Sequence, residues 1–278
     1  MQLPTHAATA LWPVDTQGLY DSPAEPPPAW LSRLDVGHAQ PVMLDPGLLQ
    51  ENRILLGNTP GPFAESFHLL RTRLLHTFRE NGWNSLAVTS PRSGTGKTLT
   101  SINLAISMAR LIGQSVLLVD TNLRQPGLLA QLGLEEGWGL RDYLTDDMPV
   151  NNLLVRPDLF EDLAILPSGE ALEDCVGILG SLRMHQLMQE LRSRSGNLVV
   201  ILDLPPILES GDAITLASEA DAALLVVEDG VTSQQDVTQA VELLRGTELA
   251  GTVLNKAPGI PLVADKRTLR GRLFPRAA

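Results

Sequence analysis

Runs of consecutive apolar residues recur along most of this chain, and longer stretches between them carry apolar residues three or four positions apart. Uninterrupted apolar runs are typical of strands that are buried on both faces of a parallel sheet, and the wider spacing is typical of helices. The alternation predicts an α/β fold with a doubly wound, mostly parallel sheet flanked by helices, whose ligands lie at the carboxyl ends of the strands. The predicted strands are residues 84–89, 115–120, 161–166, 198–203, 222–227 and 251–254, and the main predicted helices are residues 63–81, 99–111, 182–194 and 233–245.

Both ends of the chain lack this alternation. Residues 1–62 contain about half of the 20 prolines and have no sustained apolar period, so we expect a disordered arm there. Residues 257–278 are rich in Lys and Arg and are predicted to be a basic, flexible tail. It could meet acidic lipid or an acidic partner segment, or simply be solvated. The predicted folded domain is therefore residues 63–256.

A glycine-rich segment connects the first predicted strand to a helix. Residues 90–98 read Ser-Pro-Arg-Ser-Gly-Thr-Gly-Lys-Thr. Because Gly94 and Gly96 lack Cβ, the backbone can curl around a phosphate with its N–H groups inward, and the following helix adds the positive end of its dipole. The strict form of such a loop has glycine where this chain has Pro91, so an ordinary glycine-rich turn is the alternative.

Four further residues favour a nucleoside triphosphate site on a P-loop NTPase fold. Lys97 can place positive charge on the outer phosphates, and the hydroxyl of Thr98 can ligate Mg²⁺. Asp120 and Asp203 each end an apolar strand, so both carboxylates should emerge at the edge of the sheet that bears the loop. Burying an unpaired carboxylate is costly, and holding Mg²⁺ explains two of them better than turn or capping roles do.

Composition limits the other possibilities. A net charge of −11 argues against a general nucleic-acid-binding surface. The single cysteine, Cys175, excludes an internal disulfide and fits a reducing cytoplasm. We find no signal-like N-terminus and no long apolar window, which predicts a cytoplasmic protein without a membrane span of its own. The five histidines are scattered, so nucleotide-bound Mg²⁺ is the expected metal.

Taken together, three segments resemble the bacterial tyrosine kinases of capsule and exopolysaccharide synthesis, which belong to the deviant-Walker P-loop ATPases. They are Arg-Ser-Gly-Thr-Gly-Lys-Thr at 92–98, Val-Leu-Leu-Val-Asp-Thr-Asn-Leu-Arg-Gln-Pro at 116–126 and Leu-Asp-Leu-Pro-Pro at 202–206. The resemblance covers about residues 63–256. It implies a cytoplasmic, ATP-dependent protein-tyrosine kinase that uses Mg²⁺. The likeness continues through residues 139–144, 166–169, 181–184 and 253–255.

The resemblance also implies roles for individual residues. Lys97, Asp120 and Asp203 would be catalytic: Asp120 would lie near the metal as a candidate base, and Asp203 would hold a metal-bound water. Thr98, together with these two acids, would form the metal site. Asn255 is similar to the family's adenine contact. The nucleotide-binding residues implied are Arg92, Ser93, Gly94, Thr95, Gly96, Lys97, Thr98, Leu99 and Asn255.

Two further positions concern assembly. Arg92 occupies the place of a signature lysine that reaches a partner's nucleotide in the wider ATPase class, and it could equally be a solvated loop charge. Glu65, His68 and Arg71 align with a helix motif through which these kinases form rings, although His68 replaces the middle arginine. The alternative is a helix that only covers one edge of the sheet.

Two departures from the family pattern concern the reaction. Asn122 replaces the second acidic residue of an Asp-x-Asp-x-Arg motif. A positioned base contributes about 10²–10⁴ in rate, so phosphotransfer should be slow if Asn122 stands at the base position, and little is lost if Asp120 is the base. The tail lacks the family's tyrosine cluster, since the chain's tyrosines are Tyr20 and Tyr143.

Two functions remain open. One is a tyrosine kinase of the polysaccharide type that acts on a partner or on Tyr20. The other is a nucleotide-operated switch that hydrolyses ATP slowly and regulates polysaccharide polymerisation or export, and a partitioning ATPase is a third alternative. The resemblance implies a homo-oligomer at the inner face of the cell membrane. Its activator would be a separate membrane protein, a polysaccharide co-polymerase or chain-length regulator.

Overall fold

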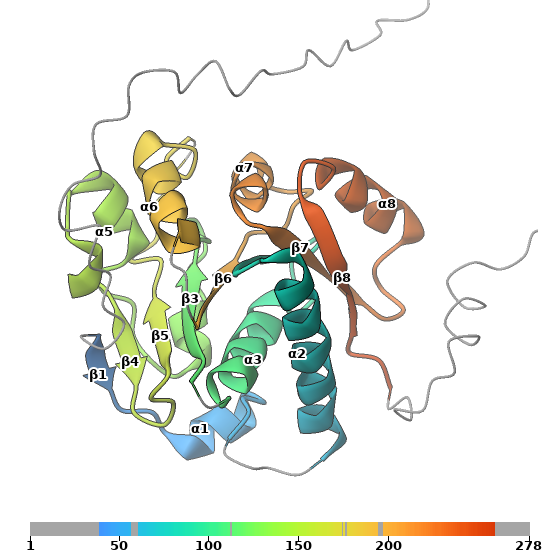
Figure 1. Cartoon of the computed structure of the whole chain (residues 1–278), viewed down its shortest axis with the longest axis horizontal. Coiled ribbons are helices and arrows are strands. Elements are labelled where there is room, and N and C mark those ends of the chain that lie inside the picture. The colour runs from blue at the N-terminus through green and yellow to red at the C-terminus, as the bar shows by residue number, and fades with distance from the viewer. Residues whose placement is uncertain are drawn as a thin grey trace, which may run out of the picture.

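The computed structural model describes residues 39–56, 61–111, 113–173, 175, 177–193 and 197–258. These residues form one eight-stranded sheet with helices on both faces (Figure 1). Within them, no helix is long and apolar enough to span a bilayer. The strands are β1 (Gln40–Val42), β2 (Ser85–Thr89), β3 (Ser115–Asp120), β4 (Val155–Pro157), β5 (Leu163–Leu166), β6 (Leu198–Asp203), β7 (Ala222–Glu228) and β8 (Glu248–Asn255).

The strand order is β1-β4-β5-β3-β6-β2-β7-β8. Paired strands are parallel except for β4 and β5, which run antiparallel. This arrangement confirms the predicted doubly wound, mostly parallel sheet. The helices are α1 (Pro46–Glu51), α2 (Pro62–Asn81), α3 (Lys97–Ala109), α4 (Leu128–Gln131), α5 (Leu140–Thr145), the 3₁₀ turn η4 (Val150–Asn152), α6 (Leu182–Ser193), α7 (Gly211–Glu219) and α8 (Gln234–Leu243).

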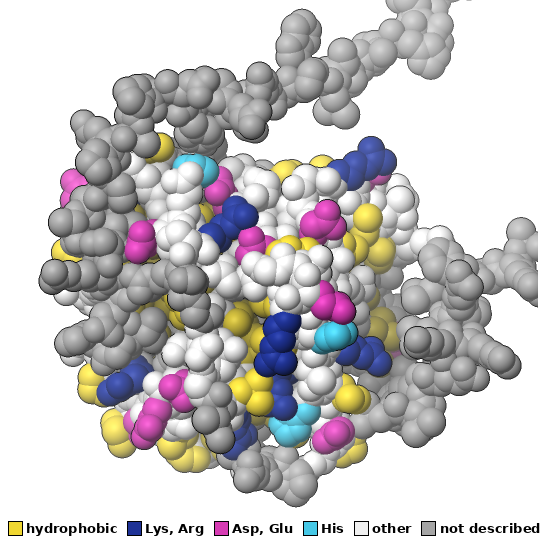
Figure 2. Space-filling view, viewed as in Figure 1, with side chains coloured by type: hydrophobic (Ala, Val, Ile, Leu, Met, Phe, Trp, Pro, Cys, Tyr) yellow, Lys and Arg dark blue, Asp and Glu magenta, His cyan; other side chains and the backbone are white. Residues whose placement is uncertain are grey.

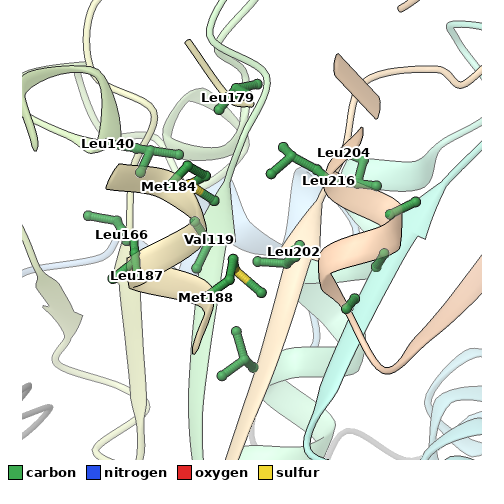
Figure 3. Close-up of a cluster of buried hydrophobic side chains, with 14 of the residues drawn as sticks. Val119, Leu140, Leu166, Leu179, Met184, Leu187, Met188, Leu202, Leu204 and Leu216 are labelled. Atoms are coloured by element: carbon green, nitrogen blue, oxygen red, sulfur yellow. The ribbon is translucent and has the colours of Figure 1, made fainter. Parts of the chain in front are cut away.

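Apolar side chains fill both faces of the sheet. On β3, Val119 points into a core covered by α5, α6, α7 and α8, whereas Leu118 points into a second core covered by α1, α2, α3 and α4. Because successive side chains of a strand alternate between faces, a strand covered on both sides must be apolar throughout, which explains the uninterrupted runs. Figure 3 shows part of the first core, where side chains of α5, α6 and α7 meet those of β3, β5 and β6.

The expected boundary of the N-terminal arm at residue 62 is wrong. Residues 39–56 fold onto the domain: β1 pairs with β4, and Leu49 and Ile54 are buried in the second core. Their apolar residues come in short groups without a period, so tertiary contacts and not local pattern order this segment. The rest of the expected arm, residues 1–38, and residues 259–278 of the expected tail lie outside the described residues.

A buried amide on α3 fastens this N-terminal segment. The side-chain oxygen of Asn103 accepts a hydrogen bond from the N–H of Leu55 at 2.7 Å, and its amide nitrogen donates to the carbonyl of Arg53 at 3.0 Å. Asn103 has no exposed surface. A polar side chain is tolerated at this depth because it satisfies two backbone groups that the segment itself cannot pair.

Replacing this anchor should destabilise the protein. Asn103→Ala leaves two backbone groups without their partner, and we expect the free energy of unfolding to fall by about 1–3 kcal/mol. Asn52→Ala is the matched control, since it removes an exposed bond from Asn52 to the carbonyl of Gln131 (2.9 Å) and should cost less than about 0.5 kcal/mol. Urea denaturation measures both, and equal losses would contradict the anchoring role.

Candidate functional site

The central strands bring the predicted acidic residues to one edge. Asp120 and Asp203 end the neighbouring strands β3 and β6 and are paired in the strand register. On the other side of β6, Asp203 pairs with Val88 of β2, the strand that leads into the glycine-rich loop. Since these strands are parallel, their carboxyl ends and the start of α3 meet at the same place.

Lys97 and Asp203 form the buried centre of this site. The Lys97 Nζ lies 3.9 Å from Asp203 Oδ2 and 3.3 Å from the hydroxyl of Thr98. The hydroxyl of Ser101, one turn further along α3, donates to Asp203 Oδ1 at 2.9 Å. Burial raises the pKa of Asp203, and the Lys97 charge opposes that rise. The structure therefore brings Lys97, Thr98 and Asp203 together as the sequence predicts.

Asp120 is as fully buried as Asp203 and has no cation in contact within the described residues. Its carboxylate accepts hydrogen bonds from the N–H groups of Asn122 (2.9 Å) and Leu128 (3.3 Å), and from the Ser168 hydroxyl (3.4 Å). Burial, and then repulsion from Asp203, raise the pKa of Asp120 to about 7. Two buried carboxylates with one nearby lysine form a cluster that is short of positive charge.

The glycine-rich loop has the backbone that the sequence predicts. Gly94 and Gly96 adopt φ angles of 79° and 87°, in the left-handed region that glycine occupies without strain. A Cβ at Gly96 would lie 2.3 Å from the side-chain nitrogen of Asn255, so another residue could not keep this contact. The loop leads directly into α3, whose first-turn N–H groups favour an anion.

The donor set fits Mg²⁺. Two carboxylates, from Asp120 and Asp203, and the hydroxyl of Thr98 offer the oxygen ligands that this ion prefers. Mg²⁺ usually keeps several waters and shares phosphate oxygens, so it does not require an all-protein cage. In the part of the chain that the structure describes, no three or more His, Cys, Asp or Glu side chains form a cluster that could hold a metal ion.

Arg92 lies at the outer rim of the loop and pairs within its own subunit. Its guanidinium donates to Asp236 Oδ1 near the start of α8, from Nε at 3.0 Å and from Nη2 at 2.8 Å. The hydrogen bond to Asp236 raises the pKa of Arg92. The next residue, Ser93, donates its N–H to the carboxylate of Glu209 at 3.3 Å. Arg92 is thus held away from the buried acids by α8.

The residues expected to mediate assembly lie on α2, over which charged and histidine side chains gather (Figure 2). Glu65 is exposed, and its carboxylate lies 3.8 Å from the imidazole of His68. Arg71 instead reaches inward and donates to the carbonyl of Ser107 on α3 at 2.8 Å. Only part of the expected motif is therefore presented on the surface of this subunit.

Sequence reasoning missed three side chains that contact the site. Ser101 follows Lys97 by four residues on a buried helix face, a spacing that could have revealed it. Ser168 lies in the Leu-Pro-Ser-Gly segment that already carried part of the family resemblance. Lys256, whose Nζ donates to the Gly94 carbonyl at 2.8 Å, follows Asn255 directly and has no signal of its own in a single sequence.

The glycine-rich loop, the two acids and the sheet define a nucleotide-binding P-loop NTPase. The sequence profile of the AAA domain family matches residues 84–254, more than half of the chain. The chain is also 30% identical to the tyrosine-protein kinase YwqD of Bacillus subtilis over 209 residues, which cover 74% of this chain and 86% of that protein. It belongs to the bacterial tyrosine kinase family within the P-loop ATPases.

Other comparisons agree with this assignment. The chain is 30% identical over 196 residues to the putative tyrosine-protein kinase EpsB of Ralstonia nicotianae, covering 70% of this chain and about a quarter (26%) of that protein. The solved BceF tyrosine kinase domain has a TM-score of 0.62 and 26% identity, covering 70% of this chain and 78% of that one. The match to MinD of Pyrococcus horikoshii, solved with Mg-ADP, has a TM-score of 0.55 and 22% identity, and it covers 69% of this chain and 77% of that one. At this identity the likeness shows the fold alone.

The burial of Asp120, together with repulsion from Asp203, should make stability depend on pH. The pKa of Asp120 is raised from an ordinary 3.8 to about 7, so between these values the folded state holds the extra proton. The free energy of unfolding therefore falls as pH rises through this window. The Asn side chain in Asp120→Asn is neutral at every pH. Without nucleotide and Mg²⁺, the free energy of unfolding of this variant relative to the wild type should therefore be about 1–3 kcal/mol higher at pH 8 than at pH 5.

Urea denaturation at the two pH values measures this gain. Asp162→Asn, at an exposed position before β5, is the matched control and should show no difference in gain between pH 5 and pH 8. An Asp120→Asn variant whose stability relative to the wild type is the same at pH 5 and at pH 8 would contradict the raised pKa of Asp120.

Proposed function

We propose that this protein is an ATP- and Mg²⁺-dependent, tyrosine-kinase-like enzyme that regulates the synthesis and export of exopolysaccharide or capsule. The observation that carries the proposal is the buried acid pair, Asp120 and Asp203, beside Lys97 at the mouth of a glycine-rich loop. The family relatives named as tyrosine kinases support the reaction class. The polysaccharide pathway follows from the family resemblance.

In this proposal the chain's own residues position and neutralise the phosphates. Lys97 and the loop N–H groups would bind the outer phosphates, and Asp120, Asp203 and Thr98 would hold Mg²⁺, which would neutralise the charge on the transferred phosphoryl group. The acceptor hydroxyl oxygen bonds to the γ-phosphorus as the bond to the β–γ bridging oxygen breaks, and ADP leaves. Asp120, which the family resemblance puts near the metal as the candidate base, would take the hydroxyl proton.

A partner supplies the membrane attachment in this proposal. The match covers 26% of EpsB, so most of that relative lies outside the kinase-like part. We place the corresponding activator, a membrane polysaccharide co-polymerase or chain-length regulator, in a separate protein, with this chain as a homo-oligomer on the inner face of the cell membrane. Glu65, His68 and Arg71 on α2 are the candidate contacts between subunits.

A second candidate is an ATPase switch that changes assembly without phosphorylating tyrosine. The burial of Tyr143 favours it: this side chain has no exposed surface, and the Arg183 guanidinium carbon lies 4.4 Å from its ring centroid. Within the described residues there is thus no accessible tyrosine for self-phosphorylation. Asn122, which lacks the carboxylate of the family pattern, points in the same direction.

Labelled ATP separates the two candidates. With Mg²⁺ and the membrane partner, the kinase yields phosphotyrosine and the switch yields free phosphate only. Lys97→Met should lower ATP affinity at least about 100-fold and abolish either product, because the buried cation that pairs with the phosphates is lost. Arg79→Met, at an exposed position on α2, is the control and should retain full activity. Undiminished turnover in Lys97→Met would contradict both candidates.

The position of any phosphate on this chain can also be predicted. Tyr143 is buried and its hydroxyl lies 3.4 Å from the Arg183 carbonyl, so a kinase cannot reach it without unfolding the segment. Phosphopeptide mass spectrometry should therefore find the label on Tyr20, which lies outside the described residues. Tyr20→Phe should abolish labelling of this chain and Tyr143→Phe should leave it unchanged. Phosphate on Tyr143 would contradict the burial argument.

A further inference from the structure

Asn255, the last residue of β8, and Lys256, the residue after it, contact two successive carbonyls of the glycine-rich loop. The side-chain nitrogen of Asn255 donates to the carbonyl of Thr95 at 2.8 Å, and Lys256 Nζ donates to the carbonyl of Gly94 at 2.8 Å. The residues involved are separated by 160 and 162 positions in the chain. The edge strand thus holds the outer side of the loop backbone.

These contacts fix the direction of two N–H groups. In a trans peptide unit, the C=O and the N–H of the next residue point in opposite directions. When the Gly94 carbonyl points to Lys256, the N–H of Thr95 points away from β8, and the Thr95 carbonyl orients the N–H of Gly96 in the same manner. Inward-pointing N–H groups are the donors with which such a loop binds phosphate.

We propose that Lys256, together with Asn255, is a positioning residue that holds these two N–H groups ready for a nucleoside diphosphate or triphosphate. The inference rests on the nucleotide site proposed above and assigns to this site a residue that neither the loop motif nor the acidic residues indicate. Lys256 does not reach the reacting atoms, since it acts on the loop from its carbonyl side.

Further contacts hold Asn255 and Lys256 in one arrangement. Glu228, at the end of β7, accepts a hydrogen bond from Lys256 Nζ at 2.9 Å, and the side-chain oxygen of Asn255 accepts one from the Lys256 N–H at 2.9 Å. Lys256 has a φ angle of 57°, a left-handed conformation that costs energy in a residue other than glycine. Such a conformation persists where surrounding contacts enforce it, and the hydrogen bonds of Lys256 to Gly94, Glu228 and Asn255 do so.

The alternative is an ordinary surface ion pair between Lys256 and Glu228, whose side chains are 47% and 17% exposed. A surface pair of this kind contributes little to stability and would not alter nucleotide binding. Affinity for nucleotide, measured together with thermal stability, therefore distinguishes a positioning role from a surface pair.

Isothermal titration calorimetry with MgADP on the full chain provides the test. Lys256→Met should raise the dissociation constant about tenfold, because a charged donor to the loop is lost. Lys256→Arg keeps a cationic N–H donor and should stay within about threefold of the wild type. In steady-state assays, the KM for ATP of Lys256→Met should rise more than its kcat falls. Arg245→Met, which removes an exposed cation after α8 that pairs with Glu242, is the control and should bind as the wild type does.

Three results would overturn the proposal. The first is a Lys256→Met variant that binds MgADP as tightly as the wild type. The second is an equal loss of affinity in the Met and Arg variants, since the retained donor would then have no effect. The third is a wild-type protein that binds no MgADP, which refutes the proposed nucleotide site as well, whereas the first two results leave that site intact.

Discussion

The site depends on the repulsion between two carboxylates that the sheet does not allow to separate. Asp120 and Asp203 face each other in the register of β3 and β6, and each is 1% exposed. Water cannot screen charges at this depth, and Lys97 lies within 4 Å of only one of the two. Burial, and then repulsion from Asp203, therefore raise the pKa of Asp120 to about 7. Such a cluster would favour a ligand that brings positive charge, such as a divalent cation.

The rest of the fold holds this pair at fixed positions. Both acids end strands that are packed on two faces, so neither backbone can shift without opening one of the two apolar cores. Their remaining oxygens are satisfied by fixed donors, Ser101 for Asp203 and the N–H groups after β3 for Asp120. Proteins commonly accept a loss of stability at a site where function requires it. Here the unfavourable negative charge lies where phosphate and metal would bind.

The sequence predicts the centre of this molecule better than its edges. The runs at 115–120 and 198–203 become β3 and β6 with the same bounds, because burial on both faces leaves an unmistakable apolar pattern. β1 and β4 have three residues each. β1 takes its order from pairing with β4, and Asn103 holds the later residues Arg53 and Leu55. Such contacts between distant segments have no local signal.

The same limit applies within the site. The meeting of Lys97 with Asp203 follows from motif and topology, since strand ends and loop must share one edge. The hydrogen-bond partners of Arg71 and Arg92 cannot be predicted from motif and topology, because an arginine near the surface can turn to any carbonyl or carboxylate that the fold brings near. Both turn to their own subunit, toward Ser107 and Asp236 respectively. The functional roles of these residues remain predictions.

The two departures from the kinase pattern concern the phosphate acceptor and not the nucleotide. Asn122 contributes only its backbone N–H to Asp120 in the hydrogen bonds described here, while the loop, Lys97 and both acids are all in place. Tyr143 is enclosed beneath Arg183 and would have to leave the core to be modified. Since Tyr143 is buried, a kinase of the proposed kind would take its tyrosine acceptor from Tyr20 or from another protein. The proposed switch would instead release phosphate to water from the same site.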